Sequence, residues 1–162
     1  MPEVSIRTAV SADAPDSVRV LRASITQLCV ADHGNRDESL RQWLANKTVP
    51  NVEAWIANPA NIMLVADVGG VIASVGCLRA DGHILLNYVA PDHRFRGASK
   101  AMLAALEQRA CALGLDAVSL ESTETARSFY KAAGYDEAGA PVTKHDLPGY
   151  PMSKRLTLES GR

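Results

Sequence analysis

Apolar and polar residues alternate along some stretches of the 162-residue chain, and elsewhere apolar residues recur every three or four positions. Alternation with a period of two is typical of a half-buried strand, and a short continuous apolar run is typical of a fully buried one. Gly69-Gly70 separates two such runs at a spacing that predicts a tight hairpin. On these grounds strands are expected at 4–10, 62–68, 71–78, 83–89, 115–120 and 152–158.

The spacing of three to four residues predicts amphipathic helices between these strands. Ser11 or Asp13 can start the first of them, Gly114 can stop the long one, and Gly134 can end the last in a left-handed conformation. Helices are expected at 11–28, 37–47, 97–113 and about 123–134, with 50–59 ambiguous and 141–151 rich in loop-forming residues. Strands and helices in this order predict one α/β domain over residues 1–162 with a mixed sheet.

Residues 85–100 form an apolar strand, a proline and a short basic loop that runs through Gly97 into the long helix. The start of a helix carries unpaired backbone N–H groups and the positive end of the helix dipole. Gly97 has no Cβ, so a bound group can come close to the backbone. Arg94, Arg96 and Lys100 add positive charge, and together these features predict a site for a phosphate or pyrophosphate.

The same segment resembles motif A of the GNAT superfamily of N-acetyltransferases, in which a strand ending Val-x-Pro precedes (Arg/Gln)-x-x-Gly-x-(Gly/Ala). The matching residues are Val89, Pro91, Arg94, Gly97 and Ala98, with Ser99 where Gly or Ala is more usual. In that family the loop holds the pyrophosphate of acetyl-coenzyme A. The resemblance therefore implies cofactor-binding residues in and around the loop, namely Tyr88, Val89, Ala90, Arg94, Phe95, Arg96, Gly97, Ala98, Ser99 and Lys100.

Three other interpretations of this loop compete with the first. It could simply join a strand to a helix, with its arginines in solvent. A P-loop of the NTPase type needs a glycine five residues before Gly97, where the chain has Asp92. A nucleophile elbow around Ser99 needs the strand to run straight into the serine, and here a loop containing Pro91 intervenes.

A second segment, Thr123-x-x-Ala126-x-x-Phe129-Tyr130-x-x-x-Gly134-Tyr135, follows the strand at 115–120. Taken alone, it predicts an ordinary amphipathic helix packed on a sheet, with Thr123 or Ser122 as a cap. It also resembles GNAT motif B, Asn-x-x-Ala-x-x-(Leu/Phe)-Tyr-x-x-x-Gly-(Phe/Tyr), with Thr123 in place of the usual Asn. The resemblance implies that Thr123, Ala126 and Phe129 help to bind the cofactor, and the two motifs stand in the order that the family requires.

For the fold, the resemblance implies a mixed, mostly antiparallel central sheet with splayed strands, flanked by helices. The cofactor lies in the gap beyond the strand that ends at Val89, and the N-terminal helices contribute to the acceptor pocket. For the reaction, it implies direct attack of an amine on the thioester of acetyl-coenzyme A, with the backbone N–H of Val89 or Ala90 polarising the carbonyl oxygen. Tyr130 is the candidate acid for the departing thiolate, or else a core aromatic residue.

The sequence does not decide which group acts as the base that removes the proton of the amine. Glu121 closes the strand before motif B. His83 and Asn87 are expected to share one strand face because their spacing is even. Glu121 or His83 could be structural instead, and water could carry the proton without a dedicated base. The acceptor is equally open, and a polyamine, an amino acid, an antibiotic, a protein N-terminus or a lysine side chain would each fit.

Composition narrows the function further. The chain has 17 basic and 18 acidic residues, a net charge of −1, which argues against nucleic acid or an anionic membrane as a partner. The three cysteines are expected to be reduced, buried and non-catalytic. No spacing of Cys and His residues resembles that of a zinc site. His33, His93 and His145 are expected in loops. Because the sequence shows no signal-peptide or membrane-spanning pattern, a cytoplasmic location is expected. The protein is expected to be a monomer or a homodimer. Two non-enzymatic alternatives remain: a regulatory module that binds acyl-coenzyme A and a structural interaction domain without a ligand.

Overall fold

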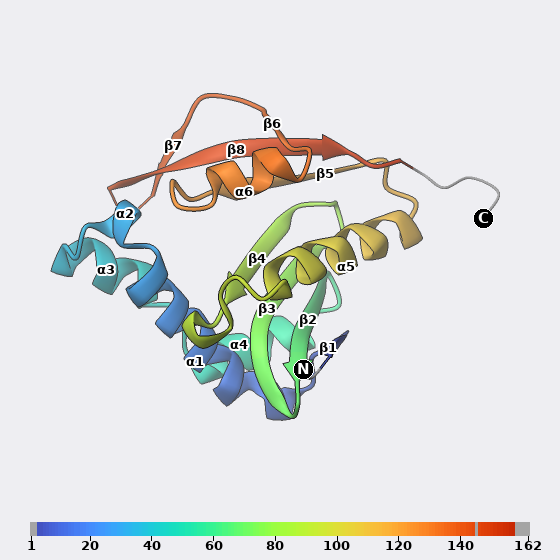
Figure 1. The fold of residues 1–162 in the computed structure, drawn as a ribbon, viewed down its shortest axis with the longest axis horizontal. Coiled ribbons are helices and arrows are strands. Elements are labelled where there is room, and N and C mark those ends of the chain that lie inside the picture. The colour runs from blue at the N-terminus through green and yellow to red at the C-terminus, as the bar shows by residue number, and fades with distance from the viewer. Residues whose placement is uncertain (1–2, 145, 158–162) are drawn as a thin grey trace.

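The computed structural model describes residues 3–144 and 146–157, and it contains two antiparallel sheets with helices around them (Figure 1). The first sheet has the order β1-β2-β3-β4, with bounds Val4–Thr8, Asn61–Val68, Val71–Arg79 and Ile84–Val89. The second has the order β5-β8-β6, with bounds Ala117–Ser122, Leu147–Arg155 and Asp136–Glu137, and β7 (Val142–Lys144) pairs with β8. His145 and Leu158 lie outside the described residues.

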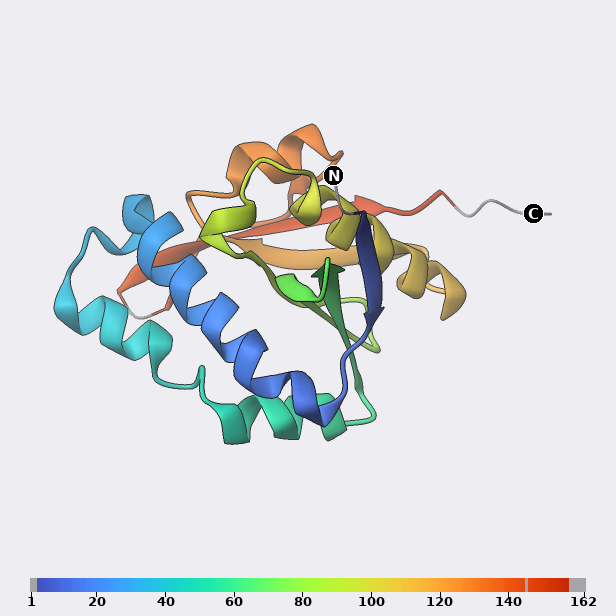
Figure 2. The same cartoon turned by 60° about the horizontal axis from the view of Figure 1, so that its bottom comes forward.

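The helices cover both faces of the first sheet. α5 (Ala98–Ala112) packs on one face, and α1 (Ala14–Leu28) and α4 (Val49–Ala57) pack on the other (Figure 2). Because both faces are covered, β2 and β3 are nearly continuous apolar runs rather than alternating ones. Three further α-helices are short: α2 (Val30–His33), α3 (Asp37–Leu44) and α6 (Arg127–Ala132). Two 3-10 helices, Ser11–Asp13 and Pro91–His93, precede α1 and the loop into α5.

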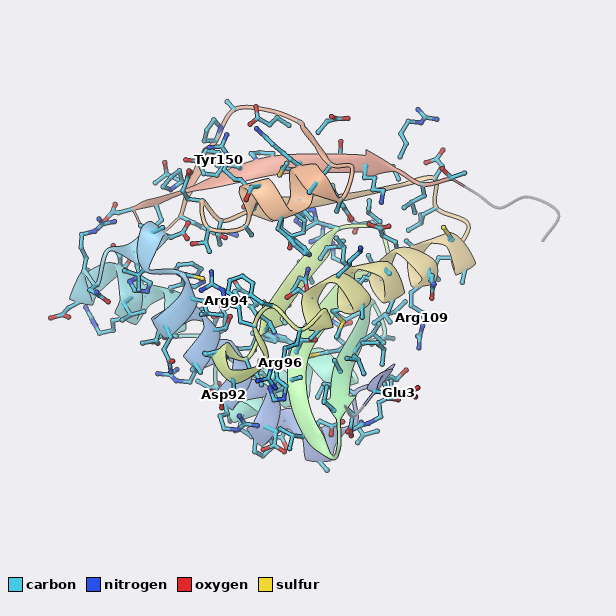
Figure 3. The ribbon with its side chains drawn as sticks, viewed as in Figure 1. Glu3, Asp92, Arg94, Arg96, Arg109 and Tyr150 are labelled. Carbon is cyan, nitrogen blue, oxygen red and sulfur yellow. The ribbon has the colours of Figure 1, made fainter. Side chains whose placement is uncertain are left out.

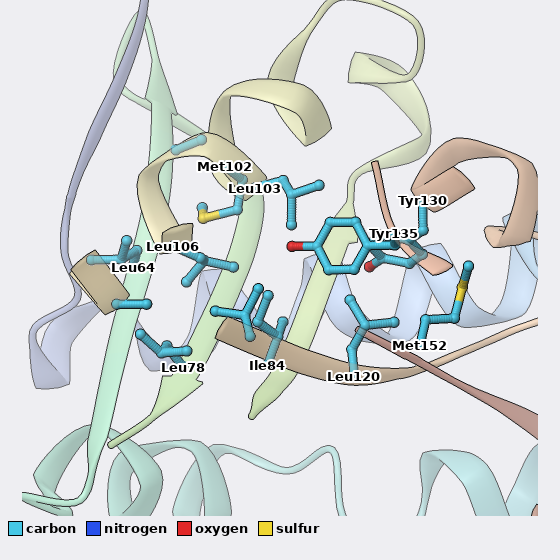
Figure 4. Close-up of a cluster of buried hydrophobic side chains, with 13 residues drawn as sticks. Leu64, Leu78, Ile84, Met102, Leu103, Leu106, Leu120, Tyr130, Tyr135 and Met152 are labelled. Carbon is cyan, nitrogen blue, oxygen red and sulfur yellow. The ribbon is translucent and has the colours of Figure 1, made fainter. Parts of the chain in front are cut away.

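The core on the α5 side joins the two sheets. Leu64 and Leu78 of the first sheet, Met102 and Leu106 of α5, and Met152 of β8 belong to one buried cluster (Figure 4). At Gly76 of β3, a Cβ atom would lie 2.5 Å from the sulfur of Met102. The absence of a side chain at Gly76 therefore lets α5 approach the sheet closely enough to bury this face.

Strands β4 and β5 meet at a single point and diverge from it. The contact is one parallel bridge between His83 and Ser119, at which the Ser119 N–H donates to the Gly82 carbonyl at 3.0 Å. Every strand pair inside the two sheets is antiparallel. The predicted mixed, mostly antiparallel arrangement with splayed strands is thereby confirmed.

Most expected elements are present with small shifts, and three expectations about loops and burial are wrong. Residues 141–151 are not mainly loop, because β7 and the first half of β8 pair there with each other and with β5. His33 is fully buried in α2, where its Nε2 lies 2.9 Å from the Ile25 carbonyl oxygen and its Nδ1 accepts from the Asn35 N–H. Cys111 is half-buried on α5 rather than buried.

Candidate functional site

A cavity of about 490 Å³ occupies the space between the diverging strands β4 and β5. Its walls come from four places: α1, β4, the loop that leads into α5, and the segment from β5 through α6. Of the residues predicted to form the site, the lining includes Tyr88, Val89, Arg94, Phe95, Gly97, Ser99, Lys100, Glu121, Thr123, Ala126, Phe129 and Tyr130. The structure therefore brings both sequence motifs to one cavity, which we call the cleft.

Three predicted residues do not line the cleft: Ala90, Arg96 and Ala98. Ala90 and Ala98 are buried in the core. Arg94 lies nearer to β5 and α6, whereas Arg96 lies on the other side of the loop (Figure 3). Because Arg94 lines the cleft and Arg96 does not, only part of the positive charge of the loop faces the cleft.

The backbone of β4 presents free polar groups to the cleft. The Ala90 N–H donates to the Ala73 carbonyl at 2.8 Å, so it is already used in the sheet. Val89 stands opposite Ser74 in the same ladder, one residue along. Because hydrogen-bonded and non-hydrogen-bonded pairs alternate in an antiparallel ladder, the Val89 N–H points away from β3, toward the cleft. Of the two donors expected from the sequence, Val89 is therefore available and Ala90 is not.

The start of α5 is a second set of free donors. Gly97 precedes the helix with a φ of 84°, a left-handed conformation, and no atom of the described residues lies within 4 Å of where its Cβ would be. Within the same part of the chain, no side chain caps this end of the helix. The first N–H groups of α5 therefore have no acceptor within the helix, and Gly97, Ser99 and Lys100 at this end of the helix line the cleft together with Arg94. Such a cradle fits a phosphate group by both hydrogen bonding and charge.

Phe95 is an exposed apolar residue in the same loop. Its side chain is 90% exposed and its φ is 65°, which is uncommon for a residue other than glycine. The Arg94 guanidinium lies 4.5 Å from the centre of the Phe95 ring. This stacked pair forms an edge of the cleft that could contact a flat, apolar or anionic part of a ligand.

Tyr130 reaches the cleft from α6. The Asn87 side-chain amide donates to the Tyr130 hydroxyl oxygen at 3.3 Å, and the Asn87 carbonyl oxygen is buried without a partner among the described residues. Burial raises the pKa of Tyr130 to about 12, so the phenol keeps its proton at neutral pH. Because its oxygen accepts from Asn87, the hydroxyl hydrogen remains free to be donated into the cleft.

The two candidate bases occupy different positions. Glu121 lines the cleft and forms an ion pair with Lys144 of β7 at 3.8 Å. His83 does not line it: its Nδ1 lies 2.8 Å from the Ser119 hydroxyl at the point where β4 and β5 meet. Burial lowers the pKa of His83. Of the two groups, Glu121 is the one that the fold places at the cleft.

The expected shared face of His83 and Asn87 is wrong. The ladder between β3 and β4 pairs Cys77 with Leu86 and Leu78 with Ile84, so Leu85 is an extra, bulged residue. The bulge reverses the alternation, and Ile84 rather than His83 shares the buried cluster of Tyr130, to which Asn87 is bonded. The bulged Leu85 is 41% exposed and lines the cleft.

Some of the site was missed by sequence reasoning. Ser24 and Leu28 of α1 and the following Cys29 line the cleft, whereas the family resemblance implied only that the N-terminal helices contribute to the acceptor pocket. The Asp32 carboxylate accepts from the backbone N–H groups of Glu124 and Thr125 at 2.5 and 3.2 Å. No local signal links residues 92 positions apart, so only the fold reveals this contact.

Replacing Cys29, Cys77 and Cys111 together with Ala or Ser is expected to leave turnover per folded molecule nearly unchanged. Burial raises the pKa of Cys29 to about 12 and that of Cys77 to about 11, so neither is a thiolate at neutral pH. The free energy of unfolding should fall by about 1–3 kcal/mol, as buried side chains are lost. Turnover and denaturant unfolding measure the two effects. A folded triple variant without turnover would indicate an acyl-cysteine step instead.

Neither a membrane span nor a metal cluster is found in the described part of the chain. Within residues 3–144 and 146–157, no helix is long and apolar enough to cross a membrane. Over the same residues, no group of three or more His, Cys, Asp or Glu side chains is arranged to hold a metal ion.

Comparison with known proteins gives consistent matches. A family model described as an acetyltransferase (GNAT) domain matches residues 29–156. A solved structure described as a GCN5-related N-acetyltransferase, aminotransferase class II, from Rhodopseudomonas palustris is 26% identical, with a TM-score of 0.84 and 96% of each chain covered. None of the curated proteins compared with the chain matches its sequence.

Two more distant structures share the fold. The PaiA N-acetyltransferase from Thermoplasma acidophilum, solved in complex with coenzyme A, is 18% identical, with a TM-score of 0.81, and 95% of this chain and 99% of that one are covered. The ribosomal-protein-alanine N-acetyltransferase from Brucella melitensis is 21% identical, with a TM-score of 0.72, and the coverage is 94% and 99%.

Proposed function

Because this chain belongs to the GNAT family and is an acyltransferase that uses acetyl-coenzyme A, we propose that its acceptor is a primary amine that attacks the thioester carbonyl directly. The observation that carries the proposal is the cleft between β4 and β5. Free N–H groups and positive charge stand at one end of it, and a protonated phenol stands in its wall.

The loop into α5 would bind the pyrophosphate of the cosubstrate. No side chain of the described residues caps the N–H groups at the start of α5, and Gly97 adds no side chain to block them. Arg94 and Lys100 line the same part of the cleft and supply charge. Binding at this point would anchor the cosubstrate and hold its thioester end between β4 and β5. Holding both reactants in place in this way can supply roughly 7–11 kcal/mol of the barrier when the geometry is good.

The edge of β4 would act on the carbonyl oxygen. The Val89 N–H points into the cleft and has no partner in the β3–β4 ladder. A fixed backbone donor at this position would stabilise negative charge on the oxygen as the amine attacks. The Ala90 N–H takes no part, because the Ala73 carbonyl already holds it.

Proton movement would involve Tyr130 and Glu121. The Tyr130 hydroxyl has a proton to donate to the departing sulfur, because burial keeps it neutral and Asn87 fixes its oxygen. Glu121 lines the cleft with its carboxylate half-exposed and held only by the 3.8 Å pair with Lys144 among the described residues. A pair this exposed is weak, so Glu121 can instead attract an acceptor ammonium or receive its proton through water.

A panel of amines tests the proposal. The panel contains a polyamine, free amino acids, an aminoglycoside, peptides with a free N-terminus and a peptide with an internal lysine. Release of free thiol from acetyl-coenzyme A is measured with each, and acetylated product is identified by mass. Amine-dependent thiol release by the wild-type protein, absent in Gly97→Asp, is the expected result. Acetylation of hydroxyl groups alone would overturn the primary-amine assignment.

A further inference from the structure

We propose that Asp32 is a positioning residue that ties the turn at residues 123–126 to the end of α1 and thereby fixes the width of the cleft. This proposal rests on the proposed function, because it assigns Asp32 a part in shaping the cosubstrate site. Asp32 does not itself line the cleft. Its effect on a ligand therefore passes through the residues to which it is bonded.

The carboxylate of Asp32 is almost entirely committed to this turn. Asp32 is 9% exposed at the end of α2, directly after α1. Its Oδ1 accepts from the Glu124 N–H at 2.5 Å. Its Oδ2 accepts from the Thr125 N–H at 3.2 Å and from the Thr125 hydroxyl at 2.5 Å. One buried carboxylate thus accepts three hydrogen bonds from two consecutive residues. These bonds form a specific anchor, since hydrogen bonds to a charged acceptor are stronger than those between neutral groups.

The anchored turn contributes directly to the cleft. Thr123, Thr125 and Ala126 line the cleft, and the turn leads into α6, which carries Tyr130. Inside the turn, the Ala126 N–H donates to the Thr123 hydroxyl at 3.2 Å. The residue at the N-terminal cap of α6, Ala126, has no side-chain oxygen with which to cap the helix. Asp32 satisfies the backbone donors before this short helix, and a helix of this length depends on such tertiary contacts.

The position of this tie explains why it should matter for the width of the cleft. At its closed end, β4 and β5 are joined by the His83–Ser119 contact. Toward the open end, the 3.3 Å Asn87–Tyr130 bond crosses the gap. Asp32 adds a tie on the α1 side, where Figure 1 shows α2 beside the turn that precedes α6. Without Asp32, the turn would lose these hydrogen bonds to α2, which directly follows α1, and the wall formed by residues 123–126 would be free to move outward.

Asp13 provides a matched control. It is 8% exposed and also accepts three hydrogen bonds, from the Arg7 guanidinium at 2.8 and 3.0 Å and from the Val10 N–H at 2.8 Å. Neither Asp13 nor its partners line the cleft. Asp13→Ala therefore removes a carboxylate of equal burial and equal bonding without touching the turn.

Calorimetry with coenzyme A and amide hydrogen exchange test the role of Asp32. In Asp32→Ala, coenzyme A affinity is expected to fall by about tenfold or more, because an ordered wall of the binding site becomes mobile. Amide exchange over residues 123–130 of the ligand-free protein should become faster. In Asp13→Ala, affinity should stay within about twofold of wild type and exchange in this segment should not change, although stability falls.

A milder pair of variants covers the case in which Asp32→Ala does not fold. Asp32→Asn retains one side-chain oxygen to accept from the Glu124 N–H but places an amide nitrogen, which cannot accept, opposite the Thr125 N–H. Asp13→Asn makes the same change at the control position. A smaller loss of affinity is expected in Asp32→Asn, and affinity within about twofold of wild type in Asp13→Asn. Unchanged affinity and exchange in Asp32→Ala, or an equal loss of affinity in Asp13→Ala, would overturn the positioning role alone. No coenzyme A binding by the wild-type protein would overturn the proposed function as well.

Discussion

Replacing Gly97 by Asp is expected to weaken coenzyme A binding by at least about a hundredfold, because two like charges about 4 Å apart near a protein surface repel by several kcal/mol. The carboxylate would stand where the free N–H groups of α5 begin and would use them itself, since Asp is a preferred residue before a helix. It would also oppose the charge of Arg94 and Lys100, which line the same end of the cleft. Calorimetry with coenzyme A measures the effect.

The other end of the same helix supplies a close control for this prediction. Gly114 has a φ of 82°, nearly the 84° of Gly97, and at both positions the space within 4 Å of where a Cβ would lie holds no atom of the described residues. Gly114→Asp therefore imposes the same left-handed strain on an Asp residue. A negative charge at the C-terminus of a helix is also unfavourable, so this control should be at least as destabilised as Gly97→Asp. Equal affinity of the two variants would remove the loop from the binding site.

Replacing Tyr130 by Phe is expected to lower turnover by about 10²-fold while coenzyme A affinity changes little, if the hydroxyl protonates the departing thiolate. The substitution retains the ring in its buried cluster and removes only the hydroxyl that Asn87 holds. Loss of that bond should lower the free energy of unfolding by about 1 kcal/mol. Turnover with the best amine of the panel, measured per folded molecule, separates the two effects.

Tyr135→Phe is the control for Tyr130→Phe. Tyr135 belongs to the same cluster, its ring centre lies 5.5 Å from that of Tyr130, and its hydroxyl donates to Glu107 at 2.7 Å. It does not line the cleft, so its replacement should reduce stability and leave turnover intact. Because the Tyr130 pKa is raised to about 12, its ionisation should not reduce the rate below about pH 10. An unchanged rate and pH profile in Tyr130→Phe would make Tyr130 a structural residue.

Local signals were sufficient where a short segment carries its own conformational requirement. Gly69-Gly70 predicted the β2–β3 hairpin, and both glycines have positive φ there. Gly134, expected to end a helix in a left-handed conformation, has a φ of 98°, and Gly114, expected to stop the long helix, has a φ of 82°. Gly97 was identified in the loop before α5 for a different reason, the absence of a Cβ that would keep a bound group away. In each case the property belongs to glycine itself, so it can be predicted without knowing the fold.

Structural features that depend on partners far along the chain could not be predicted from local sequence. Residues 147–151 contain Pro148, Gly149 and Pro151 and suggest a loop, yet they form the start of β8 because β5 and β7 supply hydrogen bonds on either side. The bulge at Leu85 likewise depends on the register against β3, and it reverses which side chains of β4 face Tyr130. Strand pairing is decided by tertiary contacts, and propensity yields to it.

The sequence by itself determined the family, the order of the elements and the loop that begins at Arg94, since these depend on residue types at fixed short spacings. Only the tertiary structure decided which groups face the cleft. In the structure the Ala90 N–H is bonded within the sheet, whereas the Val89 N–H is free. His83 lies at the point where β4 and β5 meet, and Asp32 is hydrogen-bonded to Thr125. Each of these depends on a hydrogen-bond partner distant in sequence, and no local pattern specifies such a partner.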